Sequence, residues 1–131
     1  MNLAVQYSAP EHTEAAMLMR AVRGAEHTWP ELRLFHAIPN GGYRSRRAAG
    51  LLKAEGVRPG VPDYSLPVPR GGSHGLYIEL KRVKGGRVEP EQRAWLADLT
   101  EQGYRAVVCK GWEQAWDEIR DYLASDQGVD P

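Results

Sequence analysis

The sequence lacks several features that mark whole classes of protein. Its 131 residues include a single cysteine, Cys109, which excludes an internal disulfide framework and any cysteine-rich metal site. No apolar run approaches the length of a membrane span, and residues 1–10 lack the basic start and apolar stretch of a secretory signal. We therefore expect a soluble protein of the reducing cytoplasm with no membrane partner.

The motifs of several common enzyme classes are also absent. The chain has neither a Gly-x4-Gly-Lys-Ser/Thr phosphate loop nor a dinucleotide-binding glycine fingerprint. Ser73 lies among glycines, but outside the strand-to-helix setting that a serine nucleophile requires, so residues 67–74 are interpreted as a hairpin loop. No zinc finger, RNA-recognition motif or basic zipper occurs. What remains is one domain, long enough to bury a core without disulfides or structural zinc.

Charge is balanced overall but unevenly distributed. The formal net charge is zero, yet residues 41–93 contain eleven Lys and Arg against five Asp and Glu. Such asymmetry is typical of a local phosphate-binding face, and it is equally consistent with a solvated surface of uneven charge. The charge pattern alone leaves both interpretations open.

Hydrophobic periodicity predicts an alternation of helices and strands in a domain spanning residues 1–125, followed by a frayed tail at 126–131. The order α-β-α-β-β-α-β-α indicates the α/β class, with a mixed four-stranded sheet flanked by helices. Ser8 is a candidate cap for the first helix. The last strand is apolar enough to be central in the sheet. Helices are expected at 10–24, 45–55, 90–101 and 112–123, and strands at 32–38, 63–66, 75–83 and 104–109.

Three polar residues stand where a metal-dependent phosphodiesterase needs them. Glu79 and Lys81 are two residues apart in an apolar strand, so their side chains point to the same face. Asp63 begins the preceding strand, and a hairpin of ordinary length would bring it beside Glu79. Two adjacent carboxylates repel each other unless a cation lies between them, and a hard divalent ion is the natural occupant. The alternative is a turn aspartate and a surface ion pair between Glu79 and Lys81.

These residues carry a resemblance to a known family. Residues 60–63 (Gly-Val-Pro-Asp) and 75–81 (Gly-Leu-Tyr-Ile-Glu-Leu-Lys) resemble the signature of the PD-(D/E)XK nuclease superfamily. Within it, the chain resembles the VRR-NUC (virus-type replication-repair nuclease) family from about Glu11 to Leu123, especially its small stand-alone phage and bacterial members. Residues 36–42 (His-Ala-Ile-Pro-Asn-Gly-Gly) and Gln92 extend the likeness. The resemblance implies a restriction-endonuclease-like PD-(D/E)XK core.

The resemblance also implies roles for individual residues. Asp63, Glu79 and the backbone carbonyl of Leu80 would bind Mg²⁺ or Mn²⁺. Lys81 would orient or help deprotonate the attacking water and balance charge on the phosphate. Gln92 would reach into the site, toward the metal-bound water or Lys81, although an exposed helix-surface amide is the alternative. The expected catalytic residues are therefore Asp63, Glu79, Lys81 and Gln92.

The family carries a further metal-binding glutamate on its first helix, and two acids compete for that position. Glu11 and Glu14 are three residues apart and share a helical face. Glu11 is preferred because its distance from the apolar part of the helix matches the family layout. The family often has a glutamine four residues later, where this chain has Ala15. An acid that only complements the helix dipole is the alternative.

Candidate DNA contacts lie from the end of the first predicted strand through the helix that follows it. A glycine turn offers free backbone N–H groups, and arginine binds phosphate through two parallel hydrogen bonds. Such contacts position a duplex without reading its bases. A structural histidine and a plain tight turn are the alternatives for the first members of this set. The candidates are His36, Asn40, Gly41, Gly42, Arg44, Arg46, Arg47 and Lys53.

The expected function is a metal-dependent DNA endonuclease that acts on branched replication or repair intermediates, such as Holliday junctions or flaps. Two alternatives stay open: a restriction-like duplex endonuclease, and a DNA-binding module of the same fold without catalysis. A homodimer is expected from the resemblance, and four tryptophans in a small domain give this expectation weak support.

Overall fold

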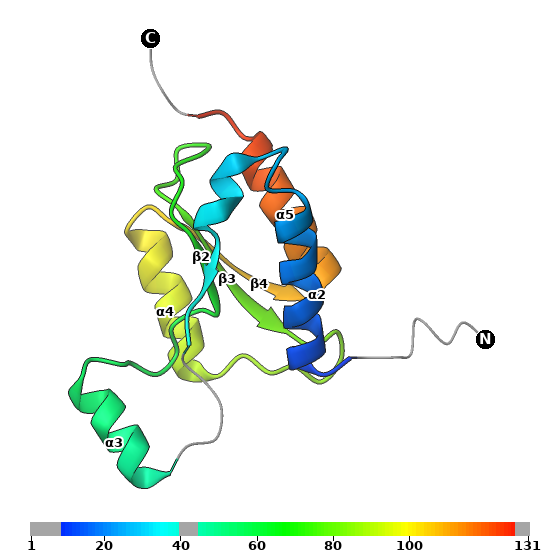
Figure 1. Ribbon diagram of the computed structural model, residues 1–131. Coiled ribbons are helices and arrows are strands. Elements are labelled where there is room, and N and C mark those ends of the chain that lie inside the picture. The colour runs from blue at the N-terminus through cyan, green and yellow to red at the C-terminus, as the bar shows by residue number, and fades with distance from the viewer. Residues whose placement is uncertain (1–8, 40–44, 128–131) are drawn as a thin grey trace.

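A computed structural model of the chain describes residues 9–39 and 45–127. Its centre is a four-stranded mixed sheet with the strand order β1-β2-β3-β4 (Figure 1). The strands are β1 (His36–Ala37), β2 (Tyr64–Leu66), β3 (Leu76–Lys81) and β4 (Arg105–Lys110). The first three pair antiparallel, whereas β3 and β4 pair parallel. The predicted mixed α/β sheet is therefore confirmed.

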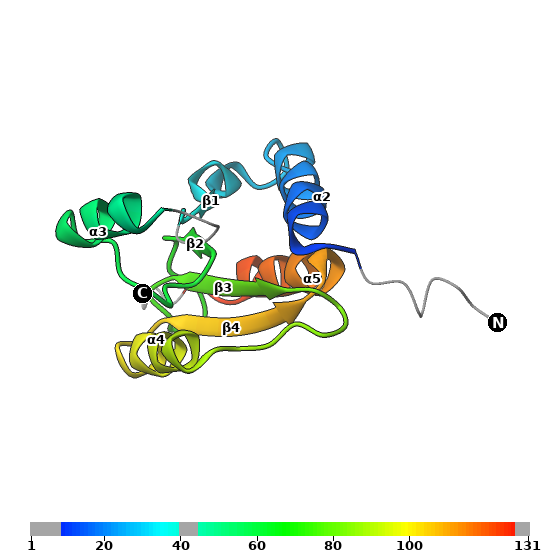
Figure 2. The same cartoon turned by 90° about the horizontal axis from the view of Figure 1, so that it is seen from below.

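Helices cover both faces of this sheet. The helices α2 (Glu11–Gly24) and α5 (Trp112–Ala124) lie side by side on one face, and α4 (Pro90–Glu101) lies on the other (Figure 2). The helix α3 (Arg46–Ala54) projects from the body of the molecule, and none of its residues is buried. No helix in the described ranges is both long and apolar enough to cross a lipid bilayer.

The core follows from the alternation of side chains along β3. Leu76, Ile78 and Leu80 are all buried in one hydrophobic cluster that also contains Leu18 of α2 and Ile119 of α5. Because successive side chains of a strand point to opposite faces, the intervening positions of β3 are directed away from this cluster. Those positions carry the polar residues of the candidate site.

The predicted strand at residues 32–38 is wrong over most of its length. Residues 30–34 form the 3₁₀ helix η1 (Pro30–Leu34), and only His36 and Ala37 pair in the sheet. Leu32 and Phe35 are buried and lie three residues apart, which is the period of a 3₁₀ helix, while Leu34 is 51% exposed. Pro30, which fixes φ and has no N–H to leave unpaired, occupies the first turn.

The prediction that the last strand is central is also wrong. In the described sheet β4 lies at the end of the strand order and pairs only with β3. Its apolar character has another cause, because α4 and α5 both pack against it from opposite faces.

Several expectations fall on parts of the chain that are not described. The candidate cap Ser8, the turn residues 40–44 and the last four residues of the tail lie outside the described ranges. The helix α2 begins after Pro10, which has no side chain to cap it. At the start of the predicted tail, the carbonyl of Asp126 accepts a hydrogen bond from the backbone N–H of Gly71 at 2.5 Å.

Candidate active site

The β2–β3 hairpin brings Asp63 to Glu79. Tyr64 pairs with Ile78, so the residues just outside this pair, Asp63 and Glu79, meet across the hairpin. One oxygen of Asp63, Oδ2, accepts a hydrogen bond from the backbone N–H of Leu80 at 2.7 Å. The carbonyl of Asp63 accepts from the N–H of Ile38 at 2.7 Å. Asp63 is thus held between β1 and β3, and its carboxyl has one fixed orientation.

Two side chains contact the same carboxylate oxygen of Glu79. Lys81 Nζ lies 3.3 Å from Glu79 Oε2, as expected for side chains on one face of a strand. Gln92 Nε2 donates to the same oxygen at 3.1 Å. The other end of that amide, Gln92 Oε1, accepts from the N–H of Glu89 at 2.8 Å and completes a capping box at the start of α4. The first turn of α4 therefore helps to hold the carboxylate of Glu79 in position.

The second oxygen of Glu79 is left without a partner. Glu79 is only 2% exposed, and its Oε1 is buried and receives no hydrogen bond from the described residues. Burial, together with the nearby charge of Asp63, raises the pKa of Glu79 from 4.5 to about 8, while Lys81 acts in the opposite direction. Burial also raises the pKa of Asp63, which the hydrogen bond from Leu80 partly offsets.

This pair of acids fits a divalent metal ion. Burial and the charge of Asp63 both favour a protonated Glu79, which is why its pKa lies well above the ordinary value. A hard cation would replace that proton and satisfy the orphaned Oε1 of Glu79. Across residues 9–39 and 45–127, no three His, Cys, Asp or Glu side chains form a metal-binding cluster. A metal ion held by Asp63 and Glu79 would therefore have two carboxylate ligands from the described residues and would keep several waters.

A cavity of about 430 Å³ opens beside Asp63. It lies between the first turns of α2, the end of β1 and the start of the hairpin. Glu11 is exposed and lines the cavity together with Asp63 and Leu80. Glu79 and Lys81 do not line it. The structure thus brings Glu11 to the same cavity as Asp63 but does not bring it to Glu79.

The two acids of the first helix, Glu11 and Glu14, have different surroundings. Glu14 is buried, and its Oε2 accepts a hydrogen bond from the N–H of Trp112 at 2.5 Å. This carboxylate therefore caps the N-terminus of α5, where the helix dipole favours negative charge. Because Glu14 is occupied there, Glu11 remains as the first-helix acid that faces the cavity.

Comparison with known proteins shows to which family the chain belongs. The family model of the VRR-NUC domain matches residues 11–113, which is most of the chain. The chain belongs to the VRR-NUC family. It is also similar to a solved structure titled "VRR_NUC domain protein", with a TM-score of 0.77 and 25% identity over 92% of this chain and 93% of that one. No curated protein matches.

Membership in the VRR-NUC family makes the chain a nuclease of the PD-(D/E)XK superfamily with a DNA substrate. Nucleases of this superfamily generally use divalent metal ions, which agrees with the paired acids of the site. The predicted family, restriction-endonuclease-like fold and nuclease class are therefore confirmed. The individual catalytic and metal-binding roles stay predictions.

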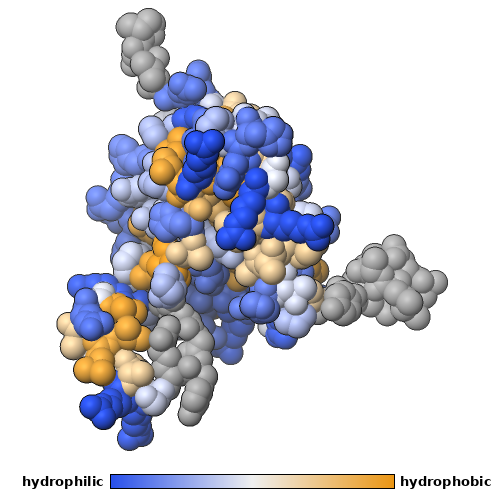
Figure 3. Space-filling view, viewed as in Figure 1, coloured by the Kyte–Doolittle hydropathy of each residue, from blue (hydrophilic) through white to orange (hydrophobic). Residues whose placement is uncertain are grey.

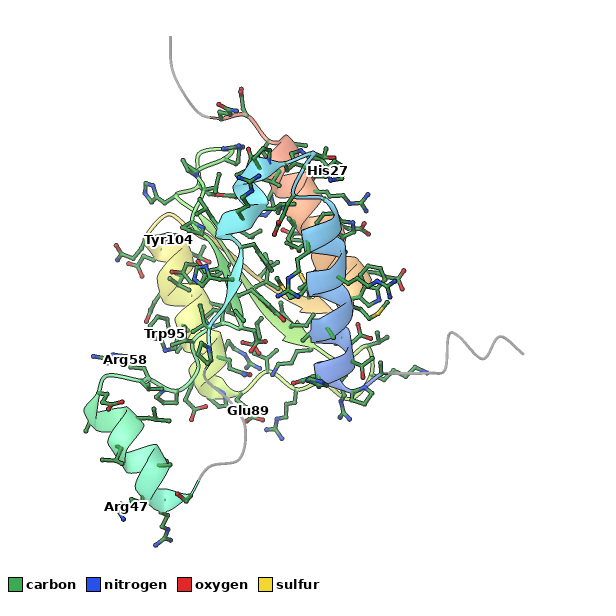
Figure 4. All side chains as sticks on the ribbon, in the orientation of Figure 1. His27, Arg47, Arg58, Glu89, Trp95 and Tyr104 are labelled. Atoms are coloured by element: carbon green, nitrogen blue, oxygen red, sulfur yellow. The ribbon has the colours of Figure 1, made fainter. Side chains whose placement is uncertain are left out.

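The described candidate DNA contacts of this VRR-NUC domain do not gather around Asp63 and Glu79. His36 is exposed and its Nδ1 lies 2.8 Å from the carbonyl oxygen of Leu34, outside the cavity beside Asp63. Arg46, Arg47 and Lys53 are exposed on α3, and Arg47 points away from the body of the molecule (Figure 4). The remaining candidates, Asn40, Gly41, Gly42 and Arg44, lie outside the described residues.

Sequence reasoning missed two residues that line the cavity. His12 follows Glu11 on the first turn of α2, and Tyr64 follows Asp63 in the hairpin. Tyr64 stacks on Phe35 with ring centroids 5.1 Å apart, and burial followed by the charge of Asp63 raises its pKa. Their positions next to the two assigned acids were the available signal.

Proposed function

We propose that this chain is a Mg²⁺- or Mn²⁺-dependent DNA endonuclease that cuts branched replication or repair intermediates, such as Holliday junctions or flaps. The observation that carries the proposal is the arrangement around Glu79. The buried carboxyl of Glu79 lies beside the half-buried carboxyl of Asp63, one oxygen of Glu79 has no partner among the described residues, and Lys81 lies 3.3 Å from its other oxygen. A purely structural ion pair would not require the second acid.

Each residue of the site would have a separate role in hydrolysis. Asp63, Glu79 and the carbonyl of Leu80 would hold the ion, which when bound lowers the pKa of a water and polarises a phosphoryl oxygen. Lys81, fixed by Glu79, would orient the water for in-line attack on phosphorus and offset the charge that develops on the phosphate. Gln92 would keep Glu79 in place from α4. The bond from phosphorus to the leaving sugar oxygen breaks, and that oxygen takes up a proton.

Selectivity for DNA shape is favoured over selectivity for base sequence. The positive side chains of α3 are exposed on a projecting helix, and arginines of this kind bind backbone phosphates. A restriction-like duplex endonuclease would in addition need a surface that reads base edges. A buried, free Cys109 fits a reducing compartment, so we place the enzyme in the cytoplasm of a bacterial or phage-infected cell.

A homodimer would suit an enzyme that cuts both strands of a symmetric junction. Support comes from the apolar side of α3, where Leu51 is 58% exposed and Val57 follows just beyond the helix end (Figure 3). An apolar hollow of about 340 Å³ lies nearby, lined in part by Val57 and Trp95. We propose a second copy as the occupant of this surface. Light scattering should show a dimer that Leu51→Lys weakens, and a stable monomer at micromolar concentration would remove this part of the proposal.

The decisive experiment is a cleavage panel with labelled four-way junctions, flaps and plain duplexes, each with and without Mn²⁺. Asp63→Asn, Glu79→Gln and Lys81→Met should each abolish cleavage while leaving the circular dichroism spectrum unchanged. Glu101→Gln, an exposed acid at the end of α4, is the matched control and should cut like the parent. If plain duplex were cut as fast as the branched substrates, and at one specific sequence, the restriction-like alternative would be favoured. Binding without cutting under all metals would favour a catalytically silent module.

A further inference from the structure

A second hollow adjoins the cavity beside Asp63. It has a volume of about 420 Å³ and lies between the start of α2 and the loop that joins β3 to α4. Glu11 lines both hollows, so the cavity beside Asp63 and the hollow at this loop meet at Glu11. The loop passes the N-terminal end of α2 in both ribbon views (Figures 1 and 2).

The loop, residues 82–88, is connected to the candidate site through Gly86 and through the start of α4. A Cβ atom on Gly86 would stand 2.8 Å from the Cβ of Lys81 and 3.1 Å from the backbone N and O of Arg82. The loop therefore folds back closely on the catalytic lysine, and only glycine permits that approach. At the other end, the capping box of α4 joins Glu89 to Gln92, which in turn donates to Glu79.

The loop presents positive charge toward this second hollow. It contains Arg82, Lys84 and Arg87 and no acid. Arg82 and Arg87 are both exposed and line the hollow. Arg82 donates one hydrogen bond to the carbonyl of Gly85 at 3.2 Å, and Arg87 makes no ion pair or hydrogen bond with any described residue. Both guanidinium groups therefore keep donors available for a ligand.

Two acids, Glu11 and Glu89, line the hollow together with the two arginines. The carboxylate of Glu89 accepts the backbone N–H three residues into α4, so its charge is directed at the helix N-terminus. Glu11 stands at the boundary with the cavity beside Asp63. An anionic ligand that spans both hollows would meet the metal centre at one end and two arginines at the other.

We propose that residues 82–88 form a phosphate-binding subsite for the DNA strand next to the scissile bond, with Arg82 and Arg87 as the contacting side chains. The inference rests on the proposed nuclease function and names where the substrate continues beyond the metal centre. The positive helix α3 lies on the opposite side of the β2–β3 hairpin (Figure 2). The two positive elements thus flank the metal centre, and the strand crosses it between them.

The first test measures DNA binding against salt concentration, in a Glu79→Gln background so that DNA is not cut. Arg82→Ala and Arg87→Ala should each reduce the slope of log affinity against log salt by about 1, because each removes one phosphate contact. Together they should weaken binding on the order of tenfold. Arg82→Lys and Arg87→Lys should restore most of the slope. The control Arg23→Ala, at the far end of α2, should match the Glu79→Gln parent.

The second test locates the contact on the DNA. A series of substrates would each carry one neutral methylphosphonate in place of a phosphate near the cut. At one or two positions beside the scissile bond, neutralisation should weaken binding by the Glu79→Gln parent but not by its Arg82→Ala, Arg87→Ala derivative. A merely structural role of the arginines would weaken binding at every position alike.

The outcomes separate this proposal from the proposed function. If the wild-type enzyme cuts DNA but the arginine variants keep the parent's salt slope and methylphosphonate pattern, the subsite is refuted and the nuclease assignment stands. If the wild-type enzyme neither cuts nor binds any DNA of the panel, both are refuted. Unchanged thermal melting of the alanine variants shows that any loss of binding is not a failure to fold.

Discussion

Removal of divalent metal should make the stability of this nuclease fall as the pH rises from about 5 to about 8. The cause is Glu79, whose pKa stands at about 8 in the folded protein against 4.5 as its ordinary value. Between these two values the folded state holds a proton that the unfolded state has lost. The free energy of unfolding therefore decreases with rising pH in this window, and the contribution is fully present only below the ordinary pKa.

The size of the effect follows from the same two pKa values. At about 1.36 kcal/mol per pKa unit, a rise from 4.5 to about 8 is worth at most about 5 kcal/mol. Penetration of water into the cavity beside Asp63 would reduce this figure, so we expect a loss of about 2–4 kcal/mol. Against a typical stability of about 5–15 kcal/mol, such a loss is readily measured.

Chemical denaturation in a chelator, at several pH values across this window, is the direct measurement. Saturating Mn²⁺ should flatten the profile, because the ion expels the proton and binds only the folded site. Below about pH 8 the apparent metal affinity should then rise about tenfold per pH unit, one proton being released for each ion bound.

Two variants make the reasoning refutable. Glu79→Gln has no proton to lose, so its stability in chelator should be independent of pH across this window and should exceed that of the parent near pH 8. The exposed Glu101→Gln should keep the parent's profile. If the parent in chelator shows constant or rising stability over this range, Glu79 is ionised in the folded protein and the proton-sharing pair with Asp63 is refuted.

Three further predictions concern residues that hold the site and its neighbouring elements in place. Gln92→Ala should lower kcat on the order of tenfold, because it removes the hydrogen bond that holds Glu79 in position. DNA affinity should change little, because Gln92 is not a proposed phosphate contact. An unchanged kcat would contradict this prediction. Glu14→Gln should cost about 1–2 kcal/mol of stability, measured by denaturation, by weakening the charged cap of α5, and should leave Mn²⁺ affinity unaltered. Gly86→Ala should cost about 1–3 kcal/mol, because its new methyl group meets the Cβ of Lys81 at 2.8 Å, and equal melting to the parent would contradict the close approach.

The centre of the site could be predicted because it depends on local geometry. The alternation of Leu76, Ile78 and Leu80 with polar residues settles which face of β3 is buried, and it places Glu79 beside Lys81 without further information. The antiparallel pairing of β2 with β3 then leaves Asp63 one position beyond the last strand pair, where it meets Glu79. Neighbours along a strand are determined by spacing alone, whereas this pair across the hairpin also depends on the register of the two strands.

The errors in the fold arose where one pattern has two structural causes. The alternation from Leu32 to Ile38 is compatible with a strand, but burial at Leu32 and Phe35 with exposure of Leu34 follows the three-residue period of η1. The apolar run of β4 indicated a central strand, whereas two helices that cover its faces produce the same composition at the end of a sheet. Composition reports how much surface is covered and not which element covers it.

The choice between Glu11 and Glu14 shows why long-range partners decide function. Both acids lie on one face of α2, and no local rule separates them. Glu14 is taken by the N–H of Trp112, which lies 98 positions further along the chain, and a buried carboxylate so engaged has no freedom to bind a metal. Glu11 has solvent on one side and borders both the cavity beside Asp63 and the arginine-lined hollow. If this placement governs its role, Glu11→Gln should change Mn²⁺-dependent cleavage and Glu14→Gln only stability. The reverse result would move the first-helix acid of the metal centre to Glu14.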